Sequence, residues 1–380
     1  MKKHSQVLAP LLSVIVISFL WHGPVGTHDA VAADGKAEWK AEWDRTLQAA
    51  QKEGQINIYA VPTYQPAVDA FRSAYPEIKV VTASGYATLA QRLMMERRGG
   101  KYVTDISING STSNFQILYG AGSFDPIVPA LILPEVTDRS RWWDETHRYL
   151  DPEGRYLFVF EGRVDPGNVS YNSKLVDPRE FNSFWDFLDP KWKGKIEAKD
   201  PRVPGSGHDD MRFYYYNSAI GPEFIRRLFS EMGVTLFRSE NQGVDWLAKG
   251  RYALCFFCST DVDRAKSQGL PVDSFGVLKE GAALVYGGGT IGLLNRAPHP
   301  NAAKLFINWF LSREGQTAAY EAMLKSRGYA SESRRVDIPK EKVFPYKRVK
   351  NVKYYDMSLP GMEWEPVRGV LDKALIKVGR

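Results

Sequence analysis

Three strand-like segments near the N-terminus alternate with two helical segments, and this order constrains the fold more than any other feature. The strands are predicted at 56–60, 78–82 and 103–108, where apolar and β-branched residues dominate. Helices are predicted from about Val68 to Tyr75 and from Ala87 to Arg98. A β-α-β-α-β run needs crossover connections, so it predicts a parallel sheet with helices on its faces.

The rest of the chain repeats this alternation, and its length of 380 residues fits two lobes. Cys255 lies on a predicted strand of a second α/β unit. Asn301–Leu324 predicts one long amphipathic helix, and the chain ends in a predicted helix at about 365–378. Within the second unit, strands are expected at 156–160, 169–171 and 195–198, and helices at 208–218, 222–232, 240–249 and 261–268.

Residues 1–33 are predicted to be a cleaved signal peptide. Lys2 and Lys3 precede an apolar stretch at 7–20 that is short for a membrane span, and Ala30-Val31-Ala32 fits a cleavage site near Ala32/Ala33. We therefore expect a periplasmic protein, with an uncleaved membrane anchor as the alternative. No cysteine lies near this segment, which argues against a lipid-anchored form.

The charge of the chain does not indicate a nucleic-acid-binding protein. The net charge is +6, and it becomes +5 when residues 1–33, which contain two lysines and one aspartate, are removed. Basic residues are scattered, apart from a denser stretch at 334–353 that we expect to be a solvated face.

No catalytic or metal-binding motif stands out, so we expect neither an enzyme nor a cofactor. His147, His208 and His299 lie far apart in sequence. The segment around Ser206 lacks the first glycine of a nucleophile elbow. Gly287, Gly289 and Gly292 match a dinucleotide-binding pattern but are followed by a predicted strand, which indicates a turn.

Cys255 and Cys258 are the only cysteines, in a C-x-x-C arrangement at the end of a buried-looking strand. They are predicted to be buried thiols or a local disulfide, and a redox pair is less favoured because such pairs start a helix. In a straight strand the two sulfurs point to opposite faces, so a disulfide requires a turn at Phe257.

Small polar residues cluster where predicted strands give way to helices. Helix N-termini attract anions, and parallel sheets bind ligands beyond the carboxyl ends of their strands. Each junction alone is also explained by helix capping. The residues predicted to bind ligand are Tyr59, Thr63, Tyr64, Ser84, Asn109, Ser111, Thr112, Ser206, Ser259, Thr260, Tyr286 and Gly288, and either Tyr59 or Tyr64 is expected to cover an organic part of the ligand.

Several motifs together resemble bacterial extracellular solute-binding proteins of ABC transporters, in the branch that contains ferric-iron and phosphonate binders. The resemblance covers about residues 36–330 and is most specific in the middle segment. The segments that carry it are Tyr171–Leu175 with Trp185, Leu188–Ile196, Asp200–Gly207, Trp246–Gly250 and Pro300–Leu305.

This resemblance implies the two-lobed α/β periplasmic binding protein type 2 fold, in which hinge strands join two lobes, each a mostly parallel sheet flanked by helices. Residues 34–165 and 290–380 would form lobe 1, and 166–289 lobe 2. The lobes would close on a small-molecule ligand and deliver it to the membrane permease of an ABC transporter. We expect a monomer.

The expected ligand is an anionic organic compound such as a carboxylate, phosphonate or phosphate ester. The iron-binding relatives carry two adjacent tyrosines after the strand that here holds Cys255, and this chain has Ser259 and Thr260 there. A ferric ion needs anionic oxygen ligands, and the hydroxyl groups of Ser and Thr are poor ones. A ferric-iron binder, a secreted enzyme on the same scaffold and a solute sensor are the alternatives.

Overall fold

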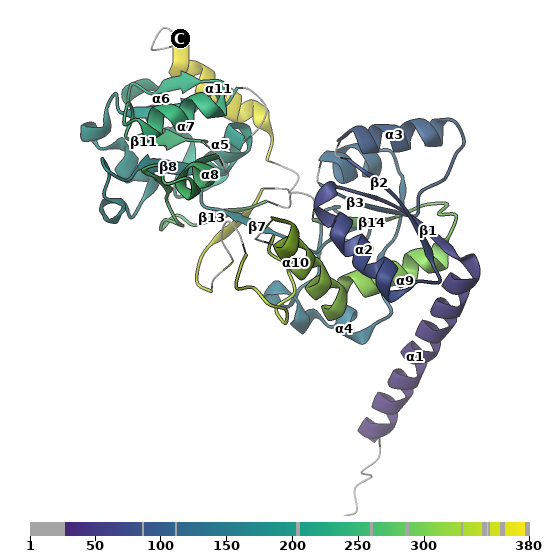
Figure 1. Cartoon of the computed structure of the whole chain (residues 1–380). Coiled ribbons are helices and arrows are strands. Elements are labelled where there is room, and N and C mark those ends of the chain that lie inside the picture. Colours follow the sequence, from purple (N-terminus) through teal and green to yellow (C-terminus); the bar gives the residue numbers. More distant parts are fainter. Residues whose placement is uncertain are drawn as a thin grey trace, which may run out of the picture.

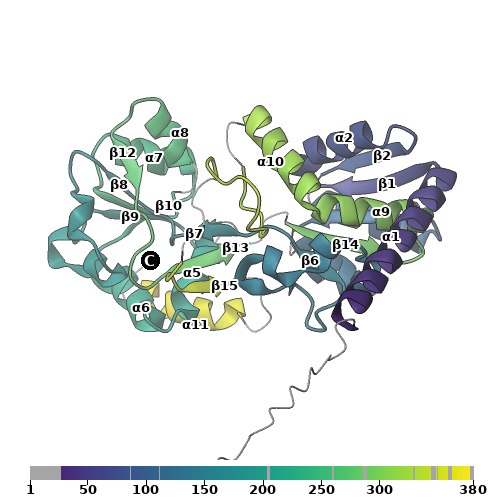
Figure 2. The same ribbon diagram turned by 90° about the horizontal axis from the view of Figure 1, so that it is seen from below.

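The computed structural model describes two lobes joined by a small bridging sheet (Figures 1 and 2). Side chains at 27–37, 87, 112, 163, 206, 209, 240, 326 and 327 are not described. The described residues are 27–85, 87–110, 112–202, 206–258, 261–285, 289–327, 330–343, 348, 350–357 and 362–376.

Lobe 1 is built on a seven-stranded sheet in the order β2-β1-β3-β14-β6-β5, with β4 beside β14. β1 pairs in parallel with β2 and β3, which confirms the parallel sheet predicted from the N-terminal run. The remaining pairings are antiparallel. The strands are β1 Gln55–Ala60, β2 Lys79–Ser84, β3 Ile106–Asn109, β4 Phe124–Asp125, β5 Arg148–Tyr149, β6 Leu157–Val159 and β14 Thr290–Leu294.

Helices cover both faces of this sheet. Because strand side chains alternate, Ile56 and Ile58 face a core with α2 and α9, while Tyr59 faces α3. The 3-10 helices are η1 Pro62–Tyr64, η3 Val128–Ala130, η4 Arg139–Arg141 and η5 Trp143–Glu145, and η2 Thr112–Tyr119 is a π-helix. The α-helices are α1 Thr27–Glu53, α2 Gln65–Ala74, α3 Ala87–Arg98, α4 Pro134–Thr137, α9 Pro300–Leu311 and α10 Arg313–Arg327.

The long helix predicted at 301–324 is two helices, because the backbone of Ser312 is extended. The Ser312 hydroxyl accepts the amide of Gly315 and so caps α10. A Cβ on Gly315 would lie 2.0 Å from the carbonyl oxygen of Trp309, so the close approach of the two helices requires glycine there. The amphipathic pattern continues through the break, which is why the pattern does not reveal it.

Lobe 2 is built on a five-stranded sheet in the order β10-β9-β11-β8-β12. β9 pairs in parallel with β10 and β11, and β8 is antiparallel to β11 and β12. The strands are β8 Val169–Asn172, β9 Ile196–Lys199, β10 Thr235–Phe237, β11 Leu254–Phe256 and β12 Val272–Ser274. The helices are η6 Pro178–Glu180, η7 Phe184–Leu188, η8 Pro190–Trp192, α5 Ser206–Tyr216, α6 Gly221–Glu231, α7 Glu240–Ala248, α8 Asp261–Ser267 and α11 Trp364–Ile376.

Three strands form the bridging sheet, in the order β15-β13-β7. They are β7 (Arg163–Asp165), β13 (Ala282–Val285) and β15 (Tyr354–Asp356). β7 leads from β6 to β8, and β13 leads from β12 back to β14, as expected for hinge strands. β15 precedes α11, which packs on α6 and α5 (Figure 1). The assignment of all of 290–380 to lobe 1 is therefore wrong for α11, whose apolar face completes the core of lobe 2.

Cys255 and Cys258 form a disulfide, which selects one of the states left open by the sequence. The turn that the bridge requires is present, because Phe257 has a φ of +65°. This left-handed conformation is uncommon for a bulky residue and turns Cys258 back toward the face of the sheet that carries Cys255.

The expectation of a solvated basic face at 334–353 is wrong for its described arginines Arg334, Arg335 and Arg348, which are buried. Arg335 pairs with Glu135 and Asp337, and Arg348 pairs with the buried carboxylate of Glu332. Burial lowers the pKa of Lys340, beside Glu332, to about 8. Asp337 lies within this stretch and Glu332 lies just before it, but the sequence does not show that the arginines will be buried against these carboxylates.

Residues 1–26, most of the predicted signal peptide, lie outside the described part. The predicted cleavage site falls within α1. Among the described residues, no helix combines the length and apolar character needed to cross a membrane.

Gly281→Ala should destabilise the protein more than Gly194→Ala. Both glycines have a positive φ, so both substitutions introduce backbone strain of about 1–2 kcal/mol. A Cβ on Gly281 would also lie 2.1 Å from the carbonyl oxygen of Lys353, beside β15, whereas a Cβ on Gly194 meets nothing within 4 Å. Urea unfolding of both variants measures the difference, and equal losses would contradict the close approach at the bridging sheet.

Glu197→Gln should stabilise the protein at high pH. Glu197 is buried, and desolvation raises the pKa of its carboxyl group from 4.5 to about 9, with Arg251 opposing the shift. Between those pH values the folded chain keeps a proton that the unfolded chain releases, so stability falls as pH rises from about 4.5 to about 9. At pH 8 the variant should gain on the order of 5 kcal/mol, and at pH 4 nothing. Denaturant titrations at both pH values test this, and a difference independent of pH would contradict it.

Candidate ligand-binding site

The carboxyl ends of the parallel strands β1, β2 and β3 lie at one edge of the lobe 1 sheet. Ala60 is opposite both Ser84 and Ile108, so the residues that follow these strands are neighbours. Ser84 is exposed, and its hydroxyl donates to the carbonyl oxygen of Ala60 at 3.2 Å. Thr63 is half-buried in η1, just after β1. The structure thus brings Thr63, Ser84 and Asn109 to the same edge.

A hydrogen-bonded network fixes the end of β3. The Asn109 side-chain oxygen accepts the amide of Gly110 at 2.9 Å, and its carbonyl oxygen accepts the Thr290 hydroxyl at 2.6 Å. The side chain of Asn114 in η2 donates to the same Thr290 hydroxyl at 2.9 Å and accepts the Ser107 hydroxyl at 2.6 Å. This network aims the N-terminus of η2, which starts at Thr112, at the same edge.

Tyr59 and Tyr64, the two N-terminal tyrosines predicted to bind ligand, are buried in this conformation. The Tyr64 ring packs edge-on against Phe160 and Phe310, with centroids 5.1 and 6.2 Å away. Its hydroxyl donates to Glu161, which lies between β6 and the crossing strand β7. Tyr59 donates to Glu96 of α3 at 2.9 Å, and burial raises the pKa of its hydroxyl. Tyr64 therefore ties the core of lobe 1 to the start of the hinge.

Lobe 2 presents a matching edge, where β9 and β11 end and α5 begins at Ser206. The crossing strand β7 is followed by Gly167 and Asn168, both with positive φ. The Asn168 amide nitrogen donates to Asp210 of α5 at 2.9 Å, and its carbonyl oxygen accepts the amide of Phe257 at 2.8 Å. The ends of β7, β11 and α5 are thereby fixed to one another.

Asn168, Asp210 and Glu161 belong to this framework and are not among the residues predicted from the sequence. The turn at Pro166-Gly167-Asn168 was the available signal, because that composition favours positive φ. The partner of a single Asp or Glu depends on tertiary contacts. Of the remaining predicted residues, Ser111, Ser259, Thr260, Tyr286 and Gly288 lie outside the described residues, and Thr112 and Ser206 are described only in their backbone.

Residues 57–317 match the family described as bacterial extracellular solute-binding protein. The chain belongs to this family. An uncharacterized protein of Haemophilus influenzae is 25% identical over 243 residues, which cover 59% of this chain and 66% of that relative, just under two thirds of its length.

Solved structures of periplasmic binding proteins share the fold. The Trichodesmium protein IdiA (FutA), in complex with iron and citrate, has a TM-score of 0.61 and 18% identity, over 84% of this chain and 99% of that chain. AfuA of Actinobacillus pleuropneumoniae, with fructose-6-phosphate bound, has a TM-score of 0.54 and 15% identity, over 86% of this chain and 99% of that chain. These similarities confirm the two-lobed α/β fold that the sequence motifs of this chain predicted.

Tyr64→Phe should lower the free energy of unfolding by about 1–3 kcal/mol, because the buried carboxylate of Glu161 loses a hydroxyl donor. Tyr119→Phe is the matched control, because Tyr119 donates to Glu153 at an exposed position. Chemical denaturation of both variants compares the two bonds. An equal small loss in both would contradict a structural role of the Tyr64 hydroxyl at the hinge.

Proposed function

We propose that this solute-binding protein captures a small anionic organic compound between its lobes and delivers it to an ABC-transporter permease from the periplasm. The observation that carries the proposal is the placement of polar strand ends and helix N-termini in both lobes. Thr63, Ser84 and Asn109 share one edge of lobe 1, and α5 starts beyond β9 of lobe 2. The antiparallel pairing of β7 with β13 joins the two lobes beside these edges.

The anion preference rests on backbone polarity. The N-terminus of α5 and that of η2 present amide groups without intrahelical partners, and their partial positive charge favours a carboxylate or phosphate oxygen. The predicted hydroxyl ligands Ser206, Ser259 and Thr260 lie at or next to such helix starts in sequence. AfuA, which shares the fold, has a sugar phosphate bound, and the IdiA structure contains citrate.

Ferric iron alone fits the described tyrosines less well. A ferric site needs anionic oxygen ligands such as phenolates. Tyr214 is fully buried and donates its hydroxyl to the carbonyl of Gly167, and burial raises the pKa of this hydroxyl well above its usual value. Tyr216 donates to the carbonyl of Glu363 at 2.9 Å. Neither of these two residues of the Tyr214–Tyr216 run is arranged as an iron ligand.

A thermal-shift screen of the mature protein tests the ligand class. The panel contains phosphate, phosphonates, sugar phosphates, small carboxylates, and ferric ion with and without citrate. A ligand at a hundred times its dissociation constant adds about 2.7 kcal/mol and should raise the unfolding midpoint by several degrees. Stabilisation by one anionic organic compound is expected, and stabilisation only by ferric ion would overturn the anion assignment.

Ser206→Ala and Thr260→Ala should each weaken binding of the compound that the screen identifies, by about tenfold for one lost hydrogen bond to a charged group. Thr137→Ala, at an exposed position in α4, is the matched control and should leave the affinity unchanged. Isothermal titration calorimetry measures all three. Unchanged affinity in both site variants would remove these residues from the binding site.

A further inference from the structure

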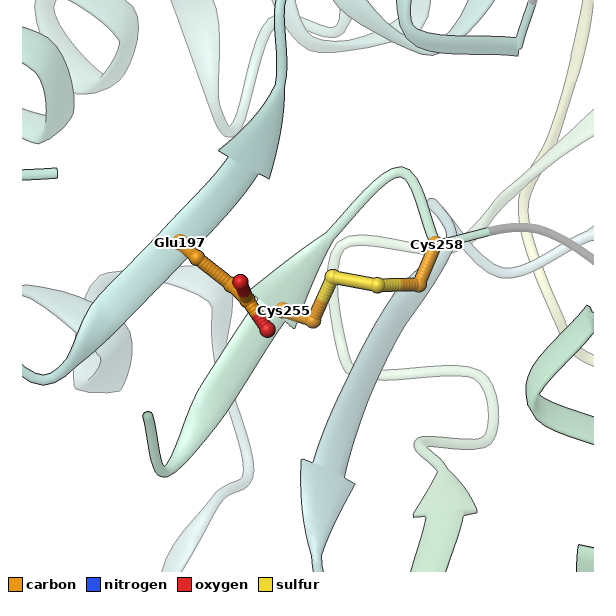
Figure 3. Close-up of side chains that lie close together, drawn as sticks. All are labelled: Glu197, Cys255 and Cys258. Carbon is orange, nitrogen blue, oxygen red and sulfur yellow. A yellow bond between two sulfur atoms is a disulfide. The ribbon is translucent and has the colours of Figure 1, made fainter. Parts of the chain in front are cut away.

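Glu197 and the disulfide lie side by side within the lobe 2 sheet. Glu197 of β9 is directly opposite Cys255 of β11 in parallel register, so the two side chains share one face of the sheet. One carboxylate oxygen of Glu197 and the sulfurs of Cys255 and Cys258 lie within 4.8 Å of one another. All three residues are 0% exposed. Figure 3 shows the carboxyl group directed at the Cys255 end of the bridge.

The carboxyl group of Glu197 makes no hydrogen bond to the described part of the chain. Both of its oxygens are buried. The surrounding layer is apolar: Phe237 of β10, Val244 and Leu247 of α7 and Val262 and Ala265 of α8 cluster with the two cysteines. The positive charge of Arg251 opposes the shift, and burial still raises the pKa of the carboxyl group to about 9. A neutral carboxylic acid, which can donate a proton, therefore stands beside the sulfur at neutral pH.

This placement is costly for the fold. A buried polar group without a hydrogen bond destabilises the folded state, and a neutral apolar side chain at this position would avoid that cost. Packing therefore does not explain a carboxyl group at this position. Among its described neighbours in this apolar layer, the disulfide is the group that changes its own protonation, because its sulfurs take up protons when the bridge is reduced.

We propose that Cys255–Cys258 is a reversible thiol–disulfide exchange site in which Glu197 donates a proton to the Cys255 sulfur. A thiolate of a dithiol reductant attacks the Cys258 sulfur, a mixed disulfide forms, and the Cys255 thiolate leaves. Glu197 protonates that thiolate. The second thiol of the reductant then displaces Cys258, and the two protons that the reductant loses restore Glu197 and protonate Cys258, so that one protein dithiol and one oxidised reductant result.

The geometry selects Cys255 as the leaving sulfur. Cys255 lies inside the sheet between β9 and β8, whereas Cys258 follows the turn at Phe257, at the end of β11. A thiolate left at Cys255 would be an ion in an apolar layer, which is strongly unfavourable without a local proton. Since both sulfurs are buried, exchange also requires a local opening at the end of β11.

Reduction would affect the edge of lobe 2 assigned to ligand binding, a consequence that rests on the proposed function. The bridge closes the turn at Phe257, whose ring lies 3.1 Å from a Cβ placed on Gly207, at the start of α5. The amide of Phe257 also donates to Asn168, which holds Asp210. The chemistry at the sulfurs can be tested without any ligand.

The experiment measures the rate at which dithiothreitol reduces the bridge in the mature protein, by quenching with a maleimide and counting labelled cysteines by mass spectrometry. Glu197→Gln keeps the shape of the neutral carboxylic acid but removes the acidic proton that it would donate to the Cys255 sulfur. The rate should fall at least about tenfold in the folded variant, since general acid catalysis contributes about 10²–10⁴-fold. In guanidinium chloride, the wild type and the variant should be reduced equally fast.

Ser170→Ala is the matched control, because Ser170 is buried beside Cys255 on the opposite strand but cannot act as an acid. Its rate should equal that of the wild type. A solvent deuterium effect larger in the folded than in the unfolded wild type gives a second readout that needs no variant. Equal folded rates for Glu197→Gln and the wild type, or a folded protein that dithiols do not reduce at all, would overturn the proposal.

Discussion

The antiparallel pairing of β7 with β13 is the contact on which the two-lobed arrangement depends. Val164 lies opposite Leu284, so two segments far apart in sequence meet where the chain leaves lobe 1 and where it returns. A two-stranded ribbon is marginal by itself. Here β15 adds a third strand. Glu161, next to β7, accepts a hydrogen bond from the hydroxyl of Tyr64 in the core of lobe 1. The hinge is thus anchored in lobe 1, while α11 ties the chain beyond β15 to lobe 2.

Buried ionisable groups in this protein are either paired with an opposite charge or kept neutral by a shifted pKa. The buried Arg348 pairs with the buried Glu332, and the buried Arg335 pairs with the half-buried Asp337, so the cost of removing the buried groups from water is offset by charge-assisted hydrogen bonds. Glu197 is buried without such a partner, and the outcome is a raised pKa rather than an ion pair. Paired groups stabilise one conformation, whereas an unpaired acid beside a disulfide remains available for proton transfer.

Some residues of the candidate site follow from local sequence pattern, whereas the positions of others depend on tertiary contacts. Ser84 and Asn109 were predicted from strand ends, and the parallel register places them together as a parallel sheet must. Tyr64 also follows a strand, but a side chain just after a strand can point into the core of the lobe instead of toward a ligand. Its ring is enclosed by Phe160 and Phe310, which come from distant parts of the chain. Sequence position alone does not distinguish these two outcomes.

The sequence by itself determined the alternation of strands and helices, the two α/β units and the family, because hydrophobic periodicity and turn residues act over short distances. It also determined that a bridge between Cys255 and Cys258 requires a turn at Phe257. Only the tertiary structure decided that α11 packs on lobe 2, that the arginines of the basic stretch are buried, and that Glu197 lies beside the disulfide. These features depend on which distant residues meet, and no periodicity within one segment encodes that.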